Sequence, residues 1–177
     1  MNITVYLGAN EGSLPELKTA VRELGRWIGE NGHRLIYGGS KCGLMGSLAE
    51  SVLTTGGEVI GVEPRFFVEA ELQYDAITEL IVTENMAERK AKMIALGEAF
   101  IAFPGGTGTL EEISEIMSMV CLGHLSAPCI LYNLNGYYEG LQLQLWQMLA
   151  AGLTTEERLQ GIRFVNSLEE IREVIDR

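Results

Sequence analysis

AFIAFPGGTGTLEE, residues 99–112, joins a short apolar run to a cluster of glycines and then to threonine and glutamate side chains. The run Ala99–Phe103 predicts a buried parallel strand, because it offers apolar side chains to both faces of a sheet. Pro104 and three glycines within the next four residues predict a turn, after which Thr107 or Thr109 can begin a helix. A strand, a glycine turn and a helix start are typical of a phosphate cradle, where backbone N–H groups and the helix dipole favour an anion.

Glu112 stands at the end of the first turn of this predicted helix. A carboxylate close to a bound phosphate repels it, so we expect no role for Glu112 as a phosphate ligand. Its carboxylate can instead address the sugar next to the phosphate. This acid therefore distinguishes the segment from a generic phosphate-binding turn.

Short apolar runs alternate with helical patterns from one end of the chain to the other. The predicted strands are Ile3–Leu7, Arg34–Tyr37, Glu58–Val62, Glu79–Val82, Ala99–Phe103, Cys129–Tyr132 and Arg163–Val165. The predicted helices are an apolar repeat from Leu14 to Ile28, with a capping box at Ser13 and Glu16, and then Met45–Thr55, Met86–Leu96, Thr109–Leu122, Tyr137–Ala151 and Leu168–Ile175. This alternation predicts an α/β fold over residues 1–177 as one domain, with a mostly parallel sheet of about seven strands and helices on both faces.

The composition limits the classes of partner. The net charge of −11 argues against nucleic acid and acidic membrane surfaces, and no apolar stretch approaches the roughly 18 residues of a spanning helix. Three widely spaced cysteines form no disulfide framework and fit buried thiols in a reducing cytoplasm. The only two histidines are far apart, so we expect no metal site, and nothing predicts a cofactor.

A second glycine cluster, GGSKCGLMG at residues 38–46, follows the second predicted strand. Its spacing matches neither the dinucleotide fingerprint GxGxxG nor the phosphate loop that ends in GK[ST], which disfavours both classes of protein. One such cluster alone could simply form a tight turn. Two clusters at the same edge of one sheet favour a ligand site.

The stretch MAERKAKM, residues 86–93, places three cations near the start of a helix, where the dipole disfavours them. This placement suggests an anion nearby. The alternative is a solvated basic face on which Glu88 pairs with Lys92.

These segments together resemble the Lonely Guy (LOG) family of nucleoside-monophosphate phosphoribohydrolases. The family motif PGGxGTxxE is matched by residues 104–112, YGGxxxGLMG by residues 37–46 with Ser40 as a departure, and MxxRKxxM by residues 86–93. Further downstream, Leu122-Gly123, Pro128 and Gly136-Tyr137-Tyr138 resemble other family positions. The resemblance runs in order over nearly the whole chain.

The resemblance implies a Rossmann-like, doubly wound homodimer that hydrolyses the N-glycosidic bond of a nucleoside 5′-monophosphate, such as AMP or a cytokinin riboside 5′-monophosphate. Arg89 and Glu112 match the two residues regarded as catalytic in the family. The expected substrate-binding residues are Gly38, Gly39, Met45, Gly46, Glu71, Met86, Lys90, Gly105, Gly106, Thr107, Gly108, Thr109, Glu111 and Ser118. Departures at Ala9-Asn10, Ser40, Cys121 and His124 bear on the preference for a base rather than on the catalytic pair.

Two other functions stay open at this point. The first is a non-catalytic nucleotide-binding or sensing protein, which would give no reason for a glutamate beside the phosphate. The second is lysine decarboxylase, a label sometimes attached to the family, for which a lysine would have to carry pyridoxal phosphate. Lys41, Lys90 and Lys92 lie near the glycine loops, but nothing else resembles a site for that cofactor.

Overall fold

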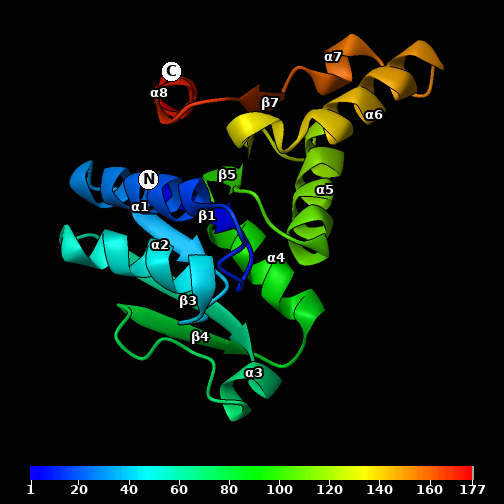
Figure 1. Cartoon of the computed structure of the whole chain (residues 1–177). Coiled ribbons are helices and arrows are strands. Elements are labelled where there is room, and N and C mark those ends of the chain that lie inside the picture. Colours follow the sequence, from blue (N-terminus) through cyan, green and yellow to red (C-terminus); the bar gives the residue numbers. More distant parts are fainter. Residues whose placement is uncertain (177) are drawn as a thin grey trace.

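The computed structural model describes residues 1–176, which contain a seven-stranded sheet (Figure 1). Its strands are β1 (Asn2–Tyr6), β2 (Arg34–Tyr37), β3 (Glu58–Pro64), β4 (Glu79–Thr83), β5 (Ala99–Ala102), β6 (Cys129–Tyr132) and β7 (Ile162–Val165). They lie in the order β4-β3-β2-β1-β5-β6-β7, and every neighbouring pair is parallel. The predicted parallel α/β sheet is therefore confirmed.

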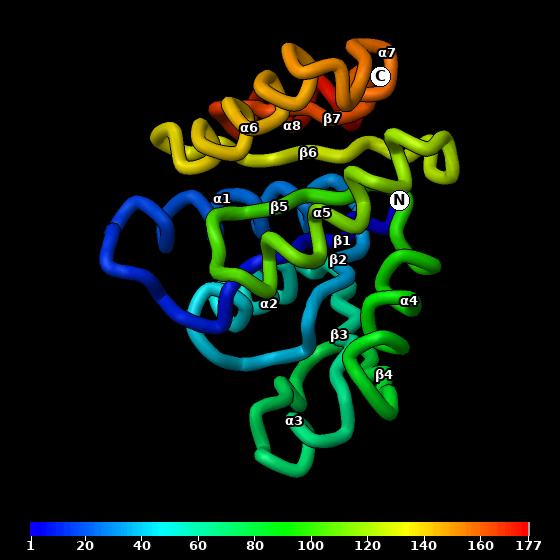
Figure 2. The backbone as a smooth tube through the Cα atoms, turned by 90° about the vertical axis from the view of Figure 1, so that its right-hand side faces the viewer, coloured from blue at the N-terminus to red at the C-terminus, as the bar shows by residue number. Residues whose placement is uncertain are grey.

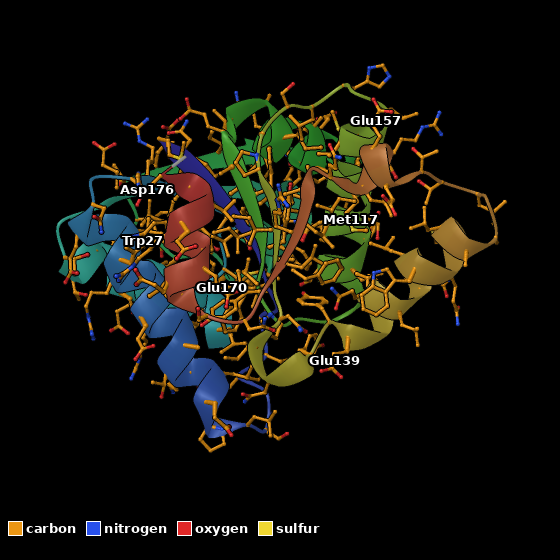
Figure 3. All side chains as sticks on the ribbon, turned by 90° about the horizontal axis from the view of Figure 1, so that it is seen from above. Trp27, Met117, Glu139, Glu157, Glu170 and Asp176 are labelled. Carbon is orange, nitrogen blue, oxygen red and sulfur yellow. The ribbon has the colours of Figure 1, made fainter. Side chains whose placement is uncertain are left out.

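Helices cover both faces of this sheet. They are α1 (Pro15–Glu30), α2 (Gly43–Thr54), α3 (Arg65–Glu69), α4 (Met86–Leu96), α5 (Thr107–Cys121), the 3-10 turn η1 (Leu134–Gly136), α6 (Glu139–Ala150), α7 (Glu156–Leu159) and α8 (Leu168–Ile175). Helices α1, α2 and α8 pack on one face, whereas α4, α5 and α6 pack on the other. Figure 3 shows Trp27 of α1 and Met117 of α5 on opposite sides of the sheet.

The central strand β5 explains why the sheet needs both layers. All four of its residues are buried, with Ile101 in the core beneath α1 and Phe100 in the core beneath α5. Full burial of one large apolar side chain contributes about 1.5–3 kcal/mol, so a strand with two apolar faces is stable only between two helix layers. The same sequence feature that predicted a strand thus also fixes the three-layer architecture.

The order of the strands creates a crevice at the carboxyl edge of the sheet. From β1 the chain runs outward through β2, β3 and β4, then returns to β5 on the other side of β1. Ligands of such sheets bind where the direction reverses. The turns after β1 and β5 meet there, since a Cβ on Gly8 would lie 3.9 Å from the Cα of Gly105. Figure 2 shows α3 beside β3 and β4, and the segment from α6 to α8 at the opposite end of the molecule.

Several local expectations differ from the structure. Helix α1 begins at Pro15 with Leu14 as its N-cap and no side-chain cap, so the predicted capping box at Ser13 and Glu16 is wrong. Proline itself favours the first helical position, because its fixed φ suits the helix and it has no N–H to leave unpaired. Helix α5 begins at Thr107, the earlier of the two starts that we predicted and two residues before the predicted range from Thr109. Helix α7 was not predicted, since four residues are too few to show a helical period.

The prediction that all three cysteines are buried is confirmed only in part. Cys129 is buried, whereas Cys42 and Cys121 are partly exposed, and all three are free. Among residues 1–176, the structure contains no helix that combines the length and apolar character needed to cross a bilayer.

Candidate active site

A pocket of about 350 Å³ lies at the carboxyl edge of the sheet, in the size range of small-molecule sites. Its walls come from the segments that follow β1, β2 and β5, from the end of β3, and from the starts of α2, α4 and α5. The lining residues are Leu7, Gly8, Ala9, Asn10, Gly38, Ser40, Met45, Glu63, Phe67, Leu72, Met86, Arg89, Gly106, Thr107, Gly108, Thr109, Glu111 and Glu112.

One wall is the N-terminus of α5. Gly106 is its N-cap, and no side chain caps the helix. The first N–H groups of an α-helix have no acceptor within the helix. A Cβ on Gly106 or Gly108 would meet nothing within 4 Å, so open space lies beside these N–H groups, whereas a Cβ on Gly105 would overlap the side chain of Thr109. This wall has the geometry and the dipole of an anion site.

Arg89 and Glu112 form a buried ion pair in the pocket wall. The Nη1 of Arg89 donates to Oε1 of Glu112 at 2.6 Å, and both residues are 5% exposed. The Nε of Arg89 donates to the carbonyl oxygen of Val62 at 3.0 Å. A Cβ on Gly38 would overlap the Nη2 of Arg89, so glycine at this position leaves room for the guanidinium. Three segments distant in sequence from α4, namely β3, α5 and the turn after β2, thus hold this arginine.

The electrostatics of the pair follow from its burial. Burial raises the pKa of the Glu112 carboxyl, while the guanidinium of Arg89 acts in the opposite direction. A buried carboxylate needs a paired cation and hydrogen bonds to remain in the protein interior. The site therefore holds an acid that water reaches only through the pocket.

Two other charged residues at the start of α4, Glu88 and Lys90, are also bonded to protein groups. The Nζ of Lys90 lies 2.8 Å from Oε1 of Glu111 and 3.2 Å from Oε2 of Glu115, so Lys90 ties α4 to α5. Glu88 accepts from Asn85 and from the backbone N–H of Glu84, and no ion pair with Lys92 is found in the described part of the chain. The expected Glu88–Lys92 pair is therefore wrong, although Lys92 is exposed. The anions near Arg89 and Lys90 are the acids of α5.

Glu63 is the charged residue of the pocket lining that sequence reasoning missed. It lies at the carboxyl end of β3, is 1% exposed, and was left outside a strand predicted to end at Val62. Burial raises the pKa of its carboxyl to about 7, against the opposing effect of Arg89. An acid within an otherwise apolar buried strand was the available signal. Phe67 and Leu72 were missed as well, because they come from the irregular stretch after β3.

The expected site residues divide into two groups. Those that line the pocket are Gly38, Met45, Met86, Arg89, Gly106, Thr107, Gly108, Thr109, Glu111 and Glu112. Those outside its lining are Gly39, Gly46, Glu71, Lys90, Gly105 and Ser118. Ser118 is exposed on the second half of α5, and Glu71 is exposed with a left-handed backbone at φ 57°. Gly46 has a packing role, because a Cβ there would overlap the carbonyl of Lys41.

Comparisons with known proteins identify the relatives of this chain. A family described as "Possible lysine decarboxylase" matches residues 45–175. The cytokinin riboside 5′-monophosphate phosphoribohydrolase of Rhodococcoides fascians is 41% identical over 87% of this chain and 78% of that protein. The probable cytokinin riboside 5′-monophosphate phosphoribohydrolase LOGL1 of Oryza sativa is 39% identical over 78% of this chain, which spans 62% of that relative's length.

A solved structure extends the likeness to the whole fold. The molybdenum cofactor carrier protein of Chlamydomonas reinhardtii superposes with a TM-score of 0.72 over 99% of this chain and 98% of that one, at 20% identity. This likeness concerns the fold alone. The motifs at residues 37–46, 86–93 and 104–112 and the identity to the phosphoribohydrolases carry the assignment, and the chain belongs to the Lonely Guy (LOG) family.

Proposed function

We propose that the protein hydrolyses the N-glycosidic bond of a nucleoside 5′-monophosphate and releases the free base and ribose 5-phosphate. AMP and cytokinin riboside 5′-monophosphates are the substrates of this proposal, which the names of its relatives support. The structural observation that carries it is the buried Arg89–Glu112 pair, which shares one pocket with the uncapped N-terminus of α5. A helix N-terminus binds phosphate, but phosphate binding alone gives no reason for a buried acid beside it.

The substrate phosphate binds at the start of α5 in this proposal. The N–H groups of residues 106–109 face the open space beside Gly106 and Gly108, and the hydroxyl of Thr109 adds a donor. Fixing the phosphate there holds the ribose at one distance from Glu112, which stands on the same helix. Binding of the phosphate in this way orients the reacting bond with respect to Glu112.

Glu112 acts on the ribose and on water. Cleavage of a ribosyl C–N bond passes through a state with positive charge on the sugar, which a nearby carboxylate stabilises. The same carboxylate orients the attacking water and accepts its proton. Arg89 holds Glu112 in place through the 2.6 Å contact and supplies the positive charge that a site with both an acid and a phosphate requires.

Lysine decarboxylation does not fit the residues present. Pyridoxal phosphate chemistry needs a lysine amine that can lose its proton and form a Schiff base. No lysine lines the pocket in the part of the chain that the structure describes. Hydrogen bonds that Lys90 donates to Glu111 and Glu115 raise the pKa of Lys90 and favour its charged form. The pocket therefore lacks the group on which that cofactor would be held.

The test is an incubation with AMP in which adenine and ribose 5-phosphate are separated and quantified by chromatography. We expect the wild type to release both, and Glu112→Gln to lower turnover by at least ~10²-fold while the protein still unfolds in one cooperative transition, because the amide keeps the shape but cannot act as a base. Glu69→Gln, an exposed residue of α3 outside the pocket, is the matched control. Tight binding of AMP without release of base would instead support the non-catalytic nucleotide-binding alternative.

A homodimer completes the proposal. Large apolar side chains are exposed on α5, on α6 and between them, namely Leu110, Leu122, Tyr137, Leu143 and Trp146. Exposed apolar surface of this extent is typical of an interaction site. Light scattering should give twice the mass of the chain, and Trp146→Glu should shift the protein towards monomer. A monomer at micromolar concentration in the wild type would contradict this part of the proposal.

A further inference from the structure

Glu63 is a second buried carboxyl in the pocket, and the substrate contacts proposed above leave it without a role. It is 1% exposed, ends β3 together with Pro64, and lines the pocket. Its Oε2 atom has no hydrogen-bond partner among residues 1–176. Buried polar atoms are nearly always hydrogen-bonded in folded proteins, and the exceptions often mark a site of function. The unpaired oxygen therefore points to a partner that enters the pocket.

Glu63 and the proposed phosphate site belong to strands that are not neighbours in the sheet. Strands β3 and β5 are separated by β2 and β1, which places their ends about 14 Å apart at the usual spacing of strands. The phosphate site lies at the β5 end, and Arg89 spans the middle, bonded to Glu112 and to the carbonyl of Val62 immediately before Glu63. The pocket lining also includes the apolar side chains of Met45, Phe67 and Leu72. Apolar walls with a few polar groups suit the flat face and the edge of a base.

The second glycine cluster leaves space for this carboxyl. Gly39 has a φ of 89°, and a Cβ there would lie 2.9 Å from the Cβ and 3.1 Å from Oε2 of Glu63. Only glycine adopts such a backbone without strain. Gly39 does not line the pocket, but the absence of a side chain there leaves the space that the Glu63 side chain occupies.

The two carboxyls differ in their surroundings. Glu112 is bonded to a guanidinium, which favours its charged form. Glu63 is buried without such a bond, and burial raises its pKa to about 7, so near neutral pH a large share of the protein carries it as the protonated acid. The buried side chain of Tyr37 lies close enough to interact electrostatically with Glu63 and stays protonated, since burial and Glu63 both raise its pKa. Paired carboxyls in unlike environments are the usual arrangement of an acid and a base in one active site.

We propose that Glu63 is a catalytic residue, the general acid that donates its proton from Oε2 to a ring nitrogen of the departing base. This inference rests on the proposed function. The bond between C1′ and the base nitrogen breaks, its electron pair goes to the base, and the proton of Glu63 neutralises the base. The oxygen of water bonds to C1′, and the proton that this water loses goes to Glu112. Solvent then restores the proton of Glu63 and removes the proton from Glu112, so one water is consumed.

The test compares two substrates that differ in their need for an acid. AMP needs a proton on its leaving base, whereas 4-nitrophenyl ribofuranoside 5-phosphate releases a stable anion. We expect Glu63→Gln to lower kcat on AMP by at least ~10²-fold and kcat on the nitrophenyl substrate by less than about 3-fold. Glu112→Gln should lower kcat on both substrates, Glu63→Asp should recover part of the activity on AMP, and Glu69→Gln on the exposed face of α3 should change neither.

The outcomes separate this inference from the proposed function. If the wild-type protein cleaves neither substrate, both the proposed function and the inference on Glu63 are wrong. Wild-type protein that cleaves AMP, together with a Glu63→Gln variant that keeps its activity or loses it equally on both substrates, overturns the inference alone. Should Glu63→Gln fail to fold, Glu63→Asp gives the same readout, because an acid that is one methylene shorter must slow AMP more than the nitrophenyl substrate.

Discussion

The two ends of the pocket hold one buried acid each, and these acids differ in their bonding partners. At the β5 end, Glu112 is bonded to Arg89 at 2.6 Å beside the start of a helix. At the β3 end, Glu63 leaves one oxygen without a partner, and its carboxyl has a pKa near 7. Burial raises the pKa of both carboxyls and the charge of Arg89 acts against this effect at both, but only Glu112 is hydrogen-bonded to that cation. One pocket can thus hold a carboxylate and a carboxylic acid at the same pH.

The largest expected effect comes from removal of the cation. Arg89→Ala leaves Glu112 buried without its partner, and breaking a buried pair in this way destabilises a protein by about 3–5 kcal/mol. Loss of the bond to the carbonyl of Val62 adds to the effect. Urea unfolding should show the loss as a lower midpoint, and release of adenine from AMP should fall by at least ~10²-fold.

A double variant separates charge from shape in this prediction. Arg89→Met with Glu112→Gln removes both charges, and apolar or neutral replacements of buried pairs are often neutral or stabilising. We therefore expect its unfolding midpoint to return most of the way to that of the wild type, while hydrolysis stays lost. A midpoint as low as that of Arg89→Ala would show that the guanidinium matters for packing rather than for the charge of Glu112.

The two ends of the pocket also differ in how far the sequence predicts them. Residues 104–112 form one continuous motif in which strand, turn and helix follow directly, so local signals suffice to place Gly106 and Glu112 together. Glu63 belongs to a strand whose neighbours come from distant parts of the chain, and its burial depends on Gly39 and Arg89. The capping box at Ser13 was wrong for a related reason, because Pro15 occupies the first helical position and Leu14 becomes the cap. Periodicity predicts elements well, whereas burial of a single acid is a tertiary property.

The comparison predicts an intermediate effect of pH at the β3 end. The pKa of the Glu63 carboxyl is 4.5 in an ordinary environment and about 7 in the folded protein. Between these pH values the folded state therefore binds the proton more strongly than the unfolded state does. The contribution of Glu63 to stability therefore falls as pH rises through this window and is constant above it. Glu63→Gln does not titrate. The difference in unfolding free energy, variant minus wild type, should therefore increase by at most about 3 kcal/mol as the pH rises from 4.5 to 8. One pKa unit corresponds to about 1.4 kcal/mol.

Thermal unfolding of both proteins over a series of pH values measures this difference, because all other titrating groups are shared. A pH-independent difference would mean that Glu63 is already ionised in the folded protein, and the contrast between the two ends of the pocket would then disappear. A difference that grows towards low pH would require a depressed pKa, opposite to the effect of burial.

The smallest expected effects come from the glycines that border the two ends. In Gly38→Ala the new methyl group overlaps the Nη2 of Arg89 and contacts Met45, so the guanidinium must shift, and overpacking of this kind costs about 1–3 kcal/mol. In Gly106→Ala the methyl group meets nothing within 4 Å and leaves the free protein unstrained, but it occupies the space proposed for the phosphate. Gly38→Ala should therefore lower both the melting temperature and kcat for AMP, whereas Gly106→Ala should keep the melting temperature and raise KM. If both variants changed only KM, the phosphate site would extend to the turn after β2, and Arg89 would be a phosphate ligand rather than the residue that positions Glu112.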